Sequence, residues 1–269
     1  MDSRDTAVLD AVVAGGSFAG LAAALQLARA RRKVVVVDTG LPRNRFAHAS
    51  HGFLVQDGRA PADILADARA QLRAYPTAEL RTGTATAARA EDGVFVVELA
   101  SGEVLRSRKL VLATGIVDEL PDVPGVRERW GRTVLHCPYC HGFEVGDGRL
   151  GVLATGEMSL HQALLLPDWS GDVTLFVNGA FILDDEKRES LAARGVRIDE
   201  RRVEALVGEA PALDGVLLED GETVTLDAVF TGSRTRMASP LAEMLTASRA
   251  MSSTVPLRNR VLSPVRGTD

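Results

Sequence analysis

Short apolar runs alternate with segments of helical periodicity along the first half of the chain. An apolar run over residues 8–14 is followed by a glycine-containing turn, and the apolar residues within 21–28 then recur at helical spacing. The four consecutive valines of 34–37 are typical of a strand that is buried on both faces of a parallel sheet. This order predicts a strand, a tight turn, a helix and a second strand, which together make a βαβ unit. Residues 61–75 again show helical spacing and predict a further helix.

A polar loop and a hairpin complete this first unit. Residues 41–58 are turn-rich and polar, and a loop of this length is often functional. Apolar residues over 94–99 and 104–105 flank a Ser-Gly turn, which predicts a hairpin. The hairpin leads to an apolar strand that we expect over 109–113.

The second half of the chain repeats this pattern. We expect strands over residues 151–154 and 173–177 and helices over 158–166 and 185–193, in alternation. A hairpin over 216–226 and a last strand over 228–231 follow. Both halves end on a Thr-Gly pair, at Gly115 and Gly232. The sequence therefore predicts an α/β protein with two Rossmann-like, doubly wound domains, the second nested in the first, each with a β-hairpin or meander.

Two crossings marked by prolines, over 117–124 and 234–240, give the expected domain boundaries. We expect residues 1–117 to form the first part of one nucleotide-binding domain, and residues 118–236 to form a second domain nested within it. Residues 237–269 would return to the first domain in a shortened or altered form.

Composition and charge narrow the classes of function. With 269 residues, 46% hydrophobic residues and a formal charge of -5, the chain has an ordinary globular composition and a net negative charge. We therefore expect no nucleic-acid or anionic-membrane partner, because such partners need concentrated positive charge. The uncharged stretch over 11–28 is broken by glycines and has no basic leader, so we expect no membrane span and a cytoplasmic protein. Residues 246–269 differ, since they carry four arginines against one aspartate.

The turn after the first apolar run is typical of a phosphate-binding loop. It contains Gly15, Gly16, Ser17, Ala19 and Gly20. Glycine lets backbone amides approach a pyrophosphate, and the helix N-terminus adds about half a positive charge. The usual pattern is Gly-x-Gly-x-x-Gly, and serine replaces the middle glycine here, with a hydroxyl that can itself donate to phosphate. The alternative is an ordinary glycine-bearing turn between a strand and a helix.

An acidic residue supports dinucleotide binding by the first unit, but the sequence signal for dinucleotide binding is weaker in the second unit. Asp38 lies about 20 residues beyond the first turn, where such units carry an acid for the ribose hydroxyls. In the second unit Gly156 has no glycine two positions later, and Glu157 puts negative charge where a phosphate would lie. Asn178 and Gly179 stand where an NADP-binding unit usually offers arginines. NADP(H) is thus only weakly supported, and a structural role is favoured for the second turn.

The strongest chemical signal is the pair Cys137 and Cys140, which His136 and His141 flank. Two thiols at this spacing can close a small disulfide ring, and a histidine can stabilise a thiolate or carry its proton. We favour a redox pair that exchanges electrons with a bound dinucleotide.

Three other interpretations of the pair are weaker. A c-type haem site has the same Cys-x-x-Cys-His order, but haem attachment requires export. A zinc site would need a second pair of ligands, for which only His48 and His51 are candidates, and we expect no metal site. Cys-Pro-Tyr-Cys is also similar to glutaredoxin, but there the pair opens a small domain, whereas here a dinucleotide fingerprint precedes it.

Together these motifs resemble those of the thioredoxin-reductase-like flavoproteins, specifically the branch of dithiol oxidases of disulfide natural products. The resemblance runs from about residue 8 to about residue 245, and it rests on the turn at 15–20, Asp38, Pro42-Arg43-Asn44, His51-Gly52-Phe53, Ala113-Thr114-Gly115, and the stretch from His136 to Glu144. It implies FAD in the first domain, with the turn at the pyrophosphate and Asp38 at the adenosine ribose. It also implies that Arg43, Asn44 and His51 approach the cofactor while Ala113 and Gly115 close over it.

The resemblance further implies roles for the cysteine pair. Cys140 would face the flavin, and Cys137 would exchange with the substrate. In the thioredoxin reductases an aspartate follows the second cysteine as acid/base, and His141 stands at that position here. A histidine with a pKa of about 6.5 is a better base for a thiol at neutral pH than an aspartate of about 3.9. We therefore expect His141 to assist thiol deprotonation.

The resulting hypothesis is an FAD-dependent thiol-disulfide oxidoreductase, and the weak second turn favours a dithiol oxidase with oxygen as acceptor. The substrate would be a small dithiol or disulfide, or a thioredoxin-like protein, and the resemblance implies a homodimer. An NADPH-dependent disulfide reductase is the alternative enzyme. A non-catalytic, flavin-free remnant or binding protein is a second alternative. The resembling flavoproteins return to the first domain with an apolar strand and a Gly-Asp segment, where this chain offers only Gly267-Thr268-Asp269.

Overall fold

The computed structural model describes residues 7–251, and its first sheet forms from the apolar runs of the first half. The strands have the order β3-β2-β1-β6-β5-β4, with β1 Leu9–Ala14, β2 Val34–Asp38, β3 Ala78–Thr82, β4 Ala85–Glu91, β5 Val94–Leu99 and β6 Val104–Leu112. The first four strands in this order are parallel, and β5 and β4 extend the sheet in antiparallel fashion.

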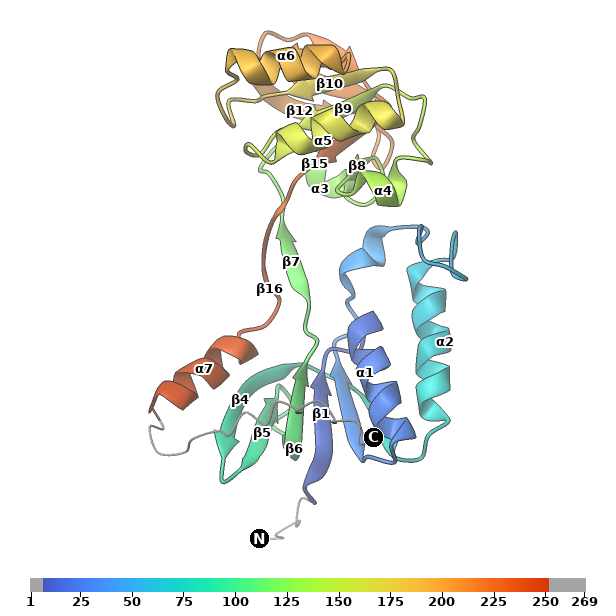
Figure 1. Ribbon diagram of the computed structural model, residues 1–269, viewed down its shortest axis with the longest axis vertical. Helices are drawn as coiled ribbons and strands as arrows, with labels where there is room; N and C mark the ends of the chain where they lie inside the picture. The colour runs from blue at the N-terminus through green and yellow to red at the C-terminus, as the bar shows by residue number, and fades with distance from the viewer. Residues whose placement is uncertain (1–6, 252–269) are drawn as a thin grey trace, which may run out of the picture.

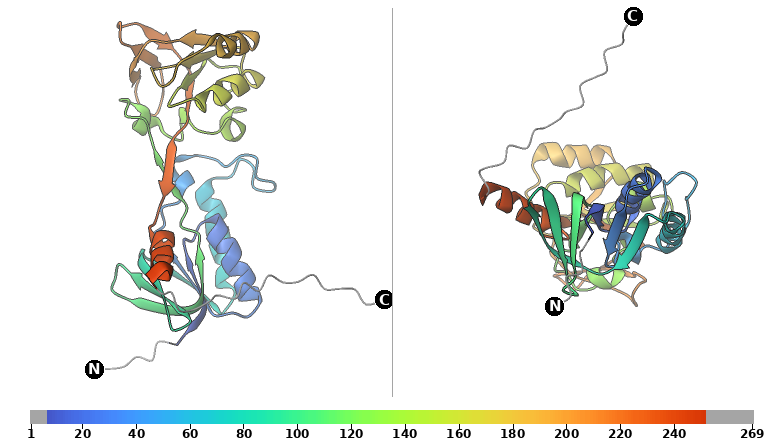
Figure 2. Two further views of the ribbon diagram at one scale, coloured as in Figure 1. Left: turned by 60° about the vertical axis from the view of Figure 1, so that its left-hand side comes forward. Right: turned by 90° about the horizontal axis from the view of Figure 1, so that it is seen from below.

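Both faces of this sheet are covered, which explains the unbroken valine run of β2. The covering helices are α1 Phe18–Arg29, α2 Pro61–Arg73 and α7 Leu241–Met251. Val34 and Val36 are buried with α1 and α2, whereas Val35 and Val37 are buried in a second cluster with Leu241 of α7. Figure 2 shows α7 and the blue helices α1 and α2 on different sides of the sheet. Neighbouring strand residues point to opposite faces, so all four valines enter a core.

A second, five-stranded parallel sheet lies at the other end of the molecule (Figure 1). Its order is β11-β10-β9-β15-β8, with β8 Val134–Leu135, β9 Leu150–Leu153, β10 Val173–Phe176, β11 Arg197–Asp199 and β15 Ala228–Thr231. One face packs on the helices α5 Ser159–Leu165 and α6 Asp185–Ala193. The other face packs on a three-stranded meander of β12 Val203–Val207, β13 Gly215–Leu218 and β14 Thr223–Thr225. The predicted α/β class with two Rossmann-like units is confirmed.

A two-stranded ribbon joins the two ends of the molecule (Figure 1). It consists of β7 Ile116–Glu119 and β16 Arg234–Met237, which pair antiparallel. The sequence predicted only proline-marked crossings here. The expected boundaries after residues 117 and 236 fall inside these strands, and the division into domains stays a prediction. Short helices complete the fold: η1 Arg43–Phe46, α3 Val126–Arg129, α4 Pro138–His141 and η2 Leu166–Asp168.

The predicted hairpins are incomplete, and one predicted strand boundary is wrong. Residues 104–105 and 109–113 were expected as separate segments, but 104–112 form one strand. Ser107 shows why, because it pairs with Phe95 of β5 on one side and with Leu9 of β1 on the other. β4 and β12 extend both hairpins to three strands, and neither was predicted; the apolar residues of β4 are all alanines, whereas β12 is only five residues long.

Within residues 7–251 no helix is long and apolar enough to span a membrane. The expectations about the C-terminus fall mostly outside the described part of the chain. Residues 252–269 include the Gly267-Thr268-Asp269 segment and most of the arginines of the basic tail, and they lie outside the described residues.

Candidate active site

The glycine turn after β1 packs tightly against the loop that follows β6. Gly15 has a φ of +103°, and a Cβ atom there would lie 2.1 Å from the carbonyl oxygen of Ala113. A Cβ atom on Gly20 would lie 1.8 Å from the carbonyl oxygen of Gly15. Only glycine fits at these positions, so the N-terminus of α1 comes close to the sheet. Ser17 caps α1 without a side-chain hydrogen bond, which leaves its hydroxyl for a ligand.

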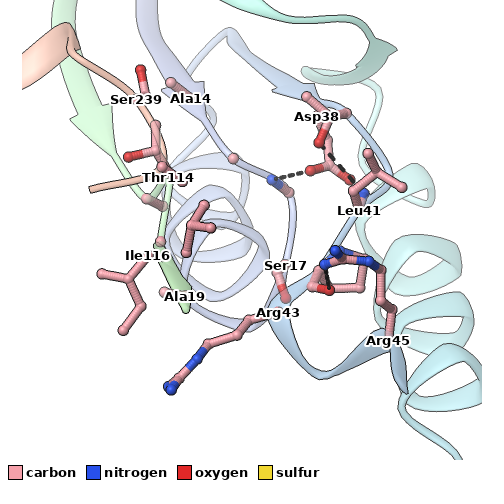
Figure 3. A pocket seen from close by; sticks show the side chains of 18 of the residues that line it. Ala14, Ser17, Ala19, Asp38, Leu41, Arg43, Arg45, Thr114, Ile116 and Ser239 are labelled. Atoms are coloured by element: carbon pink, nitrogen blue, oxygen red, sulfur yellow. Dashed lines mark hydrogen bonds between the residues drawn. The ribbon is translucent and has the colours of Figure 1, made fainter. Parts of the chain in front are cut away.

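A cavity of about 520 Å³ opens at this turn (Figure 3). Among the residues predicted to hold FAD, its lining includes Gly15, Gly16, Ser17, Ala19, Asp38, Arg43, Ala113 and Gly115. Gly20 was expected at the pyrophosphate with them, but it lies outside this lining. Gly20 instead has a packing role. Because it lacks a Cβ atom, α1 can pack directly against Gly15 and Ala113.

Asp38 lies at the end of β2 beside the turn (Figure 3). Its Oδ1 atom accepts a hydrogen bond from the Gly16 N–H (3.0 Å), and its Oδ2 atom accepts one from the Arg69 guanidinium (2.8 Å). Each carboxylate oxygen has a further lone pair, so Asp38 can still accept from a ribose hydroxyl. Sequence reasoning missed Arg69, because helical spacing alone does not show that α2 reaches this end of β2.

A second cavity of about 420 Å³ adjoins the first and extends to the cysteine pair. Ser17, Phe18, Arg43 and Asp118 line both cavities. The remaining predicted residues line the second one, namely Asn44, His51, Cys137, Cys140 and His141. The structure thus brings the dinucleotide turn and the cysteine pair, which are more than a hundred residues apart in sequence, to one continuous space.

Cys137 and Cys140 form a disulfide at the start of α4. The Cys140 N–H donates to the carbonyl of Cys137 (3.1 Å), and the Gly142 N–H donates to that of Pro138 (2.6 Å). A Cβ atom on Gly142 would lie 2.6 Å from the Pro138 carbonyl oxygen and 2.9 Å from the ring of Trp169. A tight helical turn with a glycine at its end therefore fixes the disulfide at the edge of the cavity.

Two histidines and one carboxylate lie beside the disulfide. Burial lowers the pKa of His141 below its usual value, the nearby Glu144 carboxylate acts against this, and His51 lowers the pKa further. The Nδ1 atom of His51 is 3.3 Å from Oε1 of Glu144. Glu144 was only part of the motif in the sequence, and no role was expected for it.

The other histidines near the loop and the disulfide differ in position. His136 lines the second cavity, and its Nδ1 atom is 3.4 Å from the carbonyl oxygen of Thr231. His48 is exposed and lies outside the lining of both cavities. The structure therefore groups His51, and not His48, with the cysteine pair.

An ion pair between Arg43 and Asp118 crosses the junction of the two cavities. The Arg43 guanidinium donates from Nε and Nη2 to the Asp118 carboxylate at 2.7 and 2.6 Å, and the Ser233 hydroxyl donates to it at 2.6 Å. Burial tends to raise the pKa of Asp118, but the hydrogen bonds from Arg43 and Ser233 outweigh it and lower the pKa. No pattern in the sequence indicated Asp118, because its partners come from a distant loop and from the connection between β15 and β16.

The second glycine turn, after β9, is closed by its own side chains. The Thr155 hydroxyl donates to the Gly232 carbonyl (2.8 Å), and the Thr155 N–H donates to the Ser159 hydroxyl (3.1 Å). Lys187 pairs with Asp184 at 2.7 Å, and its Nζ atom is 3.8 Å from Glu157. Acidic side chains therefore surround the lysine nearest to this turn.

The residues of the first cavity fit an FAD cofactor. Gly15 and Gly16 add no side chain to the turn, the Ser17 hydroxyl has no partner on α1, and Asp38 keeps free lone pairs. In the second cavity the buried Ser50 hydroxyl has no hydrogen-bond partner within the described residues. A polar ring system in that cavity would supply one, since buried polar atoms are normally paired.

Comparison with known proteins identifies the family. Residues 9–247 match the pyridine nucleotide-disulphide oxidoreductases. The chain belongs to this family. The resemblance to thioredoxin-reductase-like flavoproteins is thereby confirmed, and the protein is an oxidoreductase that acts on sulfur groups. Members of this oxidoreductase family use FAD and NADPH.

Individual relatives of this oxidoreductase are similar over most of their length. Thioredoxin reductase tcpT of Claviceps purpurea is 34% identical, with 88% of this chain and 77% of that protein covered. An oxidoreductase from Agrobacterium tumefaciens has a crystal structure that is 46% identical, with a TM-score of 0.84 over 88% of this chain and 79% of that one. The crystal structure of HlmI is also 46% identical, with a TM-score of 0.83 over 89% and 75%.

Proposed function

We propose that this oxidoreductase is a dithiol oxidase in which the Cys137–Cys140 disulfide takes electrons from a substrate dithiol. The observation that supports it is the continuous cavity from the glycine turn to the disulfide. The turn, Asp38 and the loop of Ala113 to Gly115 would hold the dinucleotide part of FAD. When bound, FAD supplies two-electron redox chemistry between the cysteine pair and an acceptor.

The thiol exchange itself is assigned to the protein's own groups. A substrate thiol loses its proton to His141, and the resulting thiolate attacks Cys137 while Cys140 leaves. The second substrate thiol then closes the substrate disulfide, and Cys137 leaves in turn. The assignment of Cys137 as the exchanging sulfur follows the resemblance to the family. The lowered pKa of His141 supports its part, because the imidazole is then neutral and can accept a proton at neutral pH.

Oxygen as the electron acceptor is supported by the second glycine turn. Glu157 lies in this turn, and together with Asp184 it surrounds Lys187, so this lysine is not free for the phosphates of a dinucleotide, which would need positive groups. The bonds of Thr155 to Gly232 and Ser159 also use polar groups that would face such a ligand.

Anaerobic mixing tests the proposal. The purified protein is expected to be yellow, and a dithiol is expected to bleach the flavin absorbance, which returns when oxygen is admitted. A protein that stays colourless after added FAD would instead favour the flavin-free binding protein.

An NADPH-dependent disulfide reductase is the second candidate, and the names of relatives such as thioredoxin reductase tcpT favour it. In that case NADPH would bleach the flavin rapidly without any dithiol, and a disulfide substrate or a thioredoxin-like protein would reoxidise it. A cytoplasmic location and a homodimer are also proposed; sedimentation equilibrium tests the latter.

A further inference from the structure

Glu144 lies close to His51 and three residues after His141, the two histidines of the disulfide cavity. Its Oε1 atom is 3.3 Å from Nδ1 of His51, and its charge also acts on His141. The two histidines line the same cavity as the cysteine pair, and the carboxylate approaches them from just outside that lining. The side chain of His51 is only 22% exposed and that of Glu144 is 38% exposed, so solvent screens their interaction only in part.

The same turn that carries the disulfide positions Glu144. The Glu144 N–H donates to the carbonyl of His141 (3.2 Å), directly after the close Gly142 contact with Pro138. His51 comes instead from the long polar loop of the first unit. The contact between His51 and Glu144 therefore joins the two nucleotide-binding-like units at the disulfide.

Other charged groups around these histidines leave Glu144 as their shared carboxylate among the described residues. Asp57 is 3.8 Å from Nδ1 of His51, but its Oδ1 atom accepts from the Gly52 N–H (2.8 Å) and its side chain is 68% exposed. Arg43 and Asp118 line the same cavity, and their bidentate pair neutralises both charges.

Dithiol exchange requires two proton transfers at this position. The first substrate thiol loses a proton, its sulfur bonds to Cys137, and the Cys137–Cys140 bond breaks to release Cys140 as a thiolate. The second substrate thiol loses its proton, the substrate disulfide forms, and Cys137 leaves as a thiolate. The substrate loses two electrons and the cysteine pair gains them, while two protons pass to the cysteine thiolates or to neighbouring bases.

One imidazole can accept only one of the two protons that the substrate thiols release. Two neighbouring histidines repel each other when both are protonated, and a nearby carboxylate offsets that repulsion. The Glu144 carboxylate therefore favours the protonated form of His141, against the effects of burial and of His51.

We propose that Glu144 is a positioning residue that joins His51 and His141 into one proton-holding pair for thiol exchange at the disulfide. This rests on the proposed function, because the pair matters only if the disulfide exchanges with a dithiol.

Histidine titration by NMR on the full-length flavoprotein gives the first test. In Glu144→Gln the midpoint of His141 is expected to fall, because a nearby anion favours the protonated imidazole. Glu144→Asp should restore part of the shift. His161 is exposed on α5 and serves as the internal reference that stays unchanged. An unchanged midpoint for His141 in Glu144→Gln would overturn the proposal.

The rate of disulfide reduction by dithiothreitol, followed by alkylation and mass spectrometry, gives the second test. At pH 6.5 we expect Glu144→Gln to slow reduction about 3- to 10-fold, because a less basic imidazole removes the thiol proton more slowly even when more of it is neutral. His51→Gln should slow it similarly, and the double variant should be no slower than either single variant. The matched control Asp57→Asn should change the rate less than twofold.

Multiplied effects in the double variant would show that the two residues act independently and would contradict the proposal. This assay needs neither oxygen nor NADPH. A wild-type disulfide that dithiols cannot reduce would defeat the proposed function itself, whereas normal reduction in Glu144→Gln would defeat only the role of Glu144.

Discussion

The residues at the disulfide owe their chemistry to neighbours from distant parts of the chain. His141 follows Cys140 directly, but its lowered pKa comes mainly from burial in a cavity that the other unit helps to form. The disulfide lies on a four-residue helix that a glycine ends, so its position depends on backbone packing against Trp169. Single residues therefore supply the reactive atoms, and packing sets their environment.

Serine variants of the two cysteines separate their roles. Cys140→Ser leaves Cys137 able to form a mixed disulfide with a substrate thiol, so mass spectrometry should find a stable adduct. Cys137→Ser should form much less adduct, because under the proposed assignment the remaining sulfur of Cys140 would face the flavin. Both variants should keep their flavin absorbance but lose bleaching by dithiols. An adduct found mainly on Cys137→Ser would reverse the assignment.

The two strand–turn–helix elements look alike in sequence but differ in their packing. A Cβ atom on Gly20 of α1 would meet a carbonyl oxygen at 1.8 Å, whereas one on Gly156 in the second turn would meet nothing within 4 Å. In the first turn the glycines let backbone segments pack closely against each other. In the second turn the hydroxyls of Thr155 and Ser159 form the hydrogen bonds that hold the backbone.

Alanine at these two glycines is a matched comparison of the elements. Gly20→Ala should cost about 1 to 3 kcal/mol of stability, as overpacking typically does, and should lower the flavin content. Gly156→Ala should leave both nearly unchanged, because its added methyl group enters open space. Urea unfolding and the ratio of flavin to protein absorbance measure these effects. Equal losses in both variants would show that the two turns are equivalent after all.

Across the whole molecule, the ribbon of β7 and β16 and the Arg43–Asp118–Ser233 cluster connect the two sheets. Asp118 lies on β7, Ser233 directly precedes β16, and Arg43 belongs to the loop of the first unit. This cluster holds the cysteine-bearing unit where the two cavities meet. It supports the continuity of the site together with the His51–Glu144 contact at the disulfide.

Acidification should remove the contribution of this cluster to stability. The pKa of Asp118 is lowered in the folded protein, so its stabilisation is fully present above the unfolded value of about 3.9 and is lost as the pH falls through the folded pKa. Asp118→Asn should therefore lower the thermal midpoint at pH 7, and the difference from wild type should shrink toward pH 3. A difference that stays constant over this range would assign the effect to packing rather than to the charge.

The sequence by itself determined the local parts of this protein. The valine run of β2, the glycine turn, Asp38 and the Cys-x-x-Cys pair are readable because their signals lie within a few residues or at a fixed spacing. From them follow the α/β class, the repeated nucleotide-binding pattern and the redox chemistry. The polar edge strand β3 and the small-residue strand β4 carry no such signal, because their pairing depends on the rest of the sheet.

Only the tertiary structure decided how these parts meet. Arg69 on Asp38, Asp118 on Arg43 and Glu144 on His51 are contacts between residues that no periodicity relates. Each depends on how helices and loops pack after the sheets have formed, and charge alone does not select one carboxylate among 36 acidic residues. The continuous cavity also depends on tertiary packing. The ribbon of β7 and β16 and the Arg43–Asp118 ion pair bring together two units that are separate in the sequence.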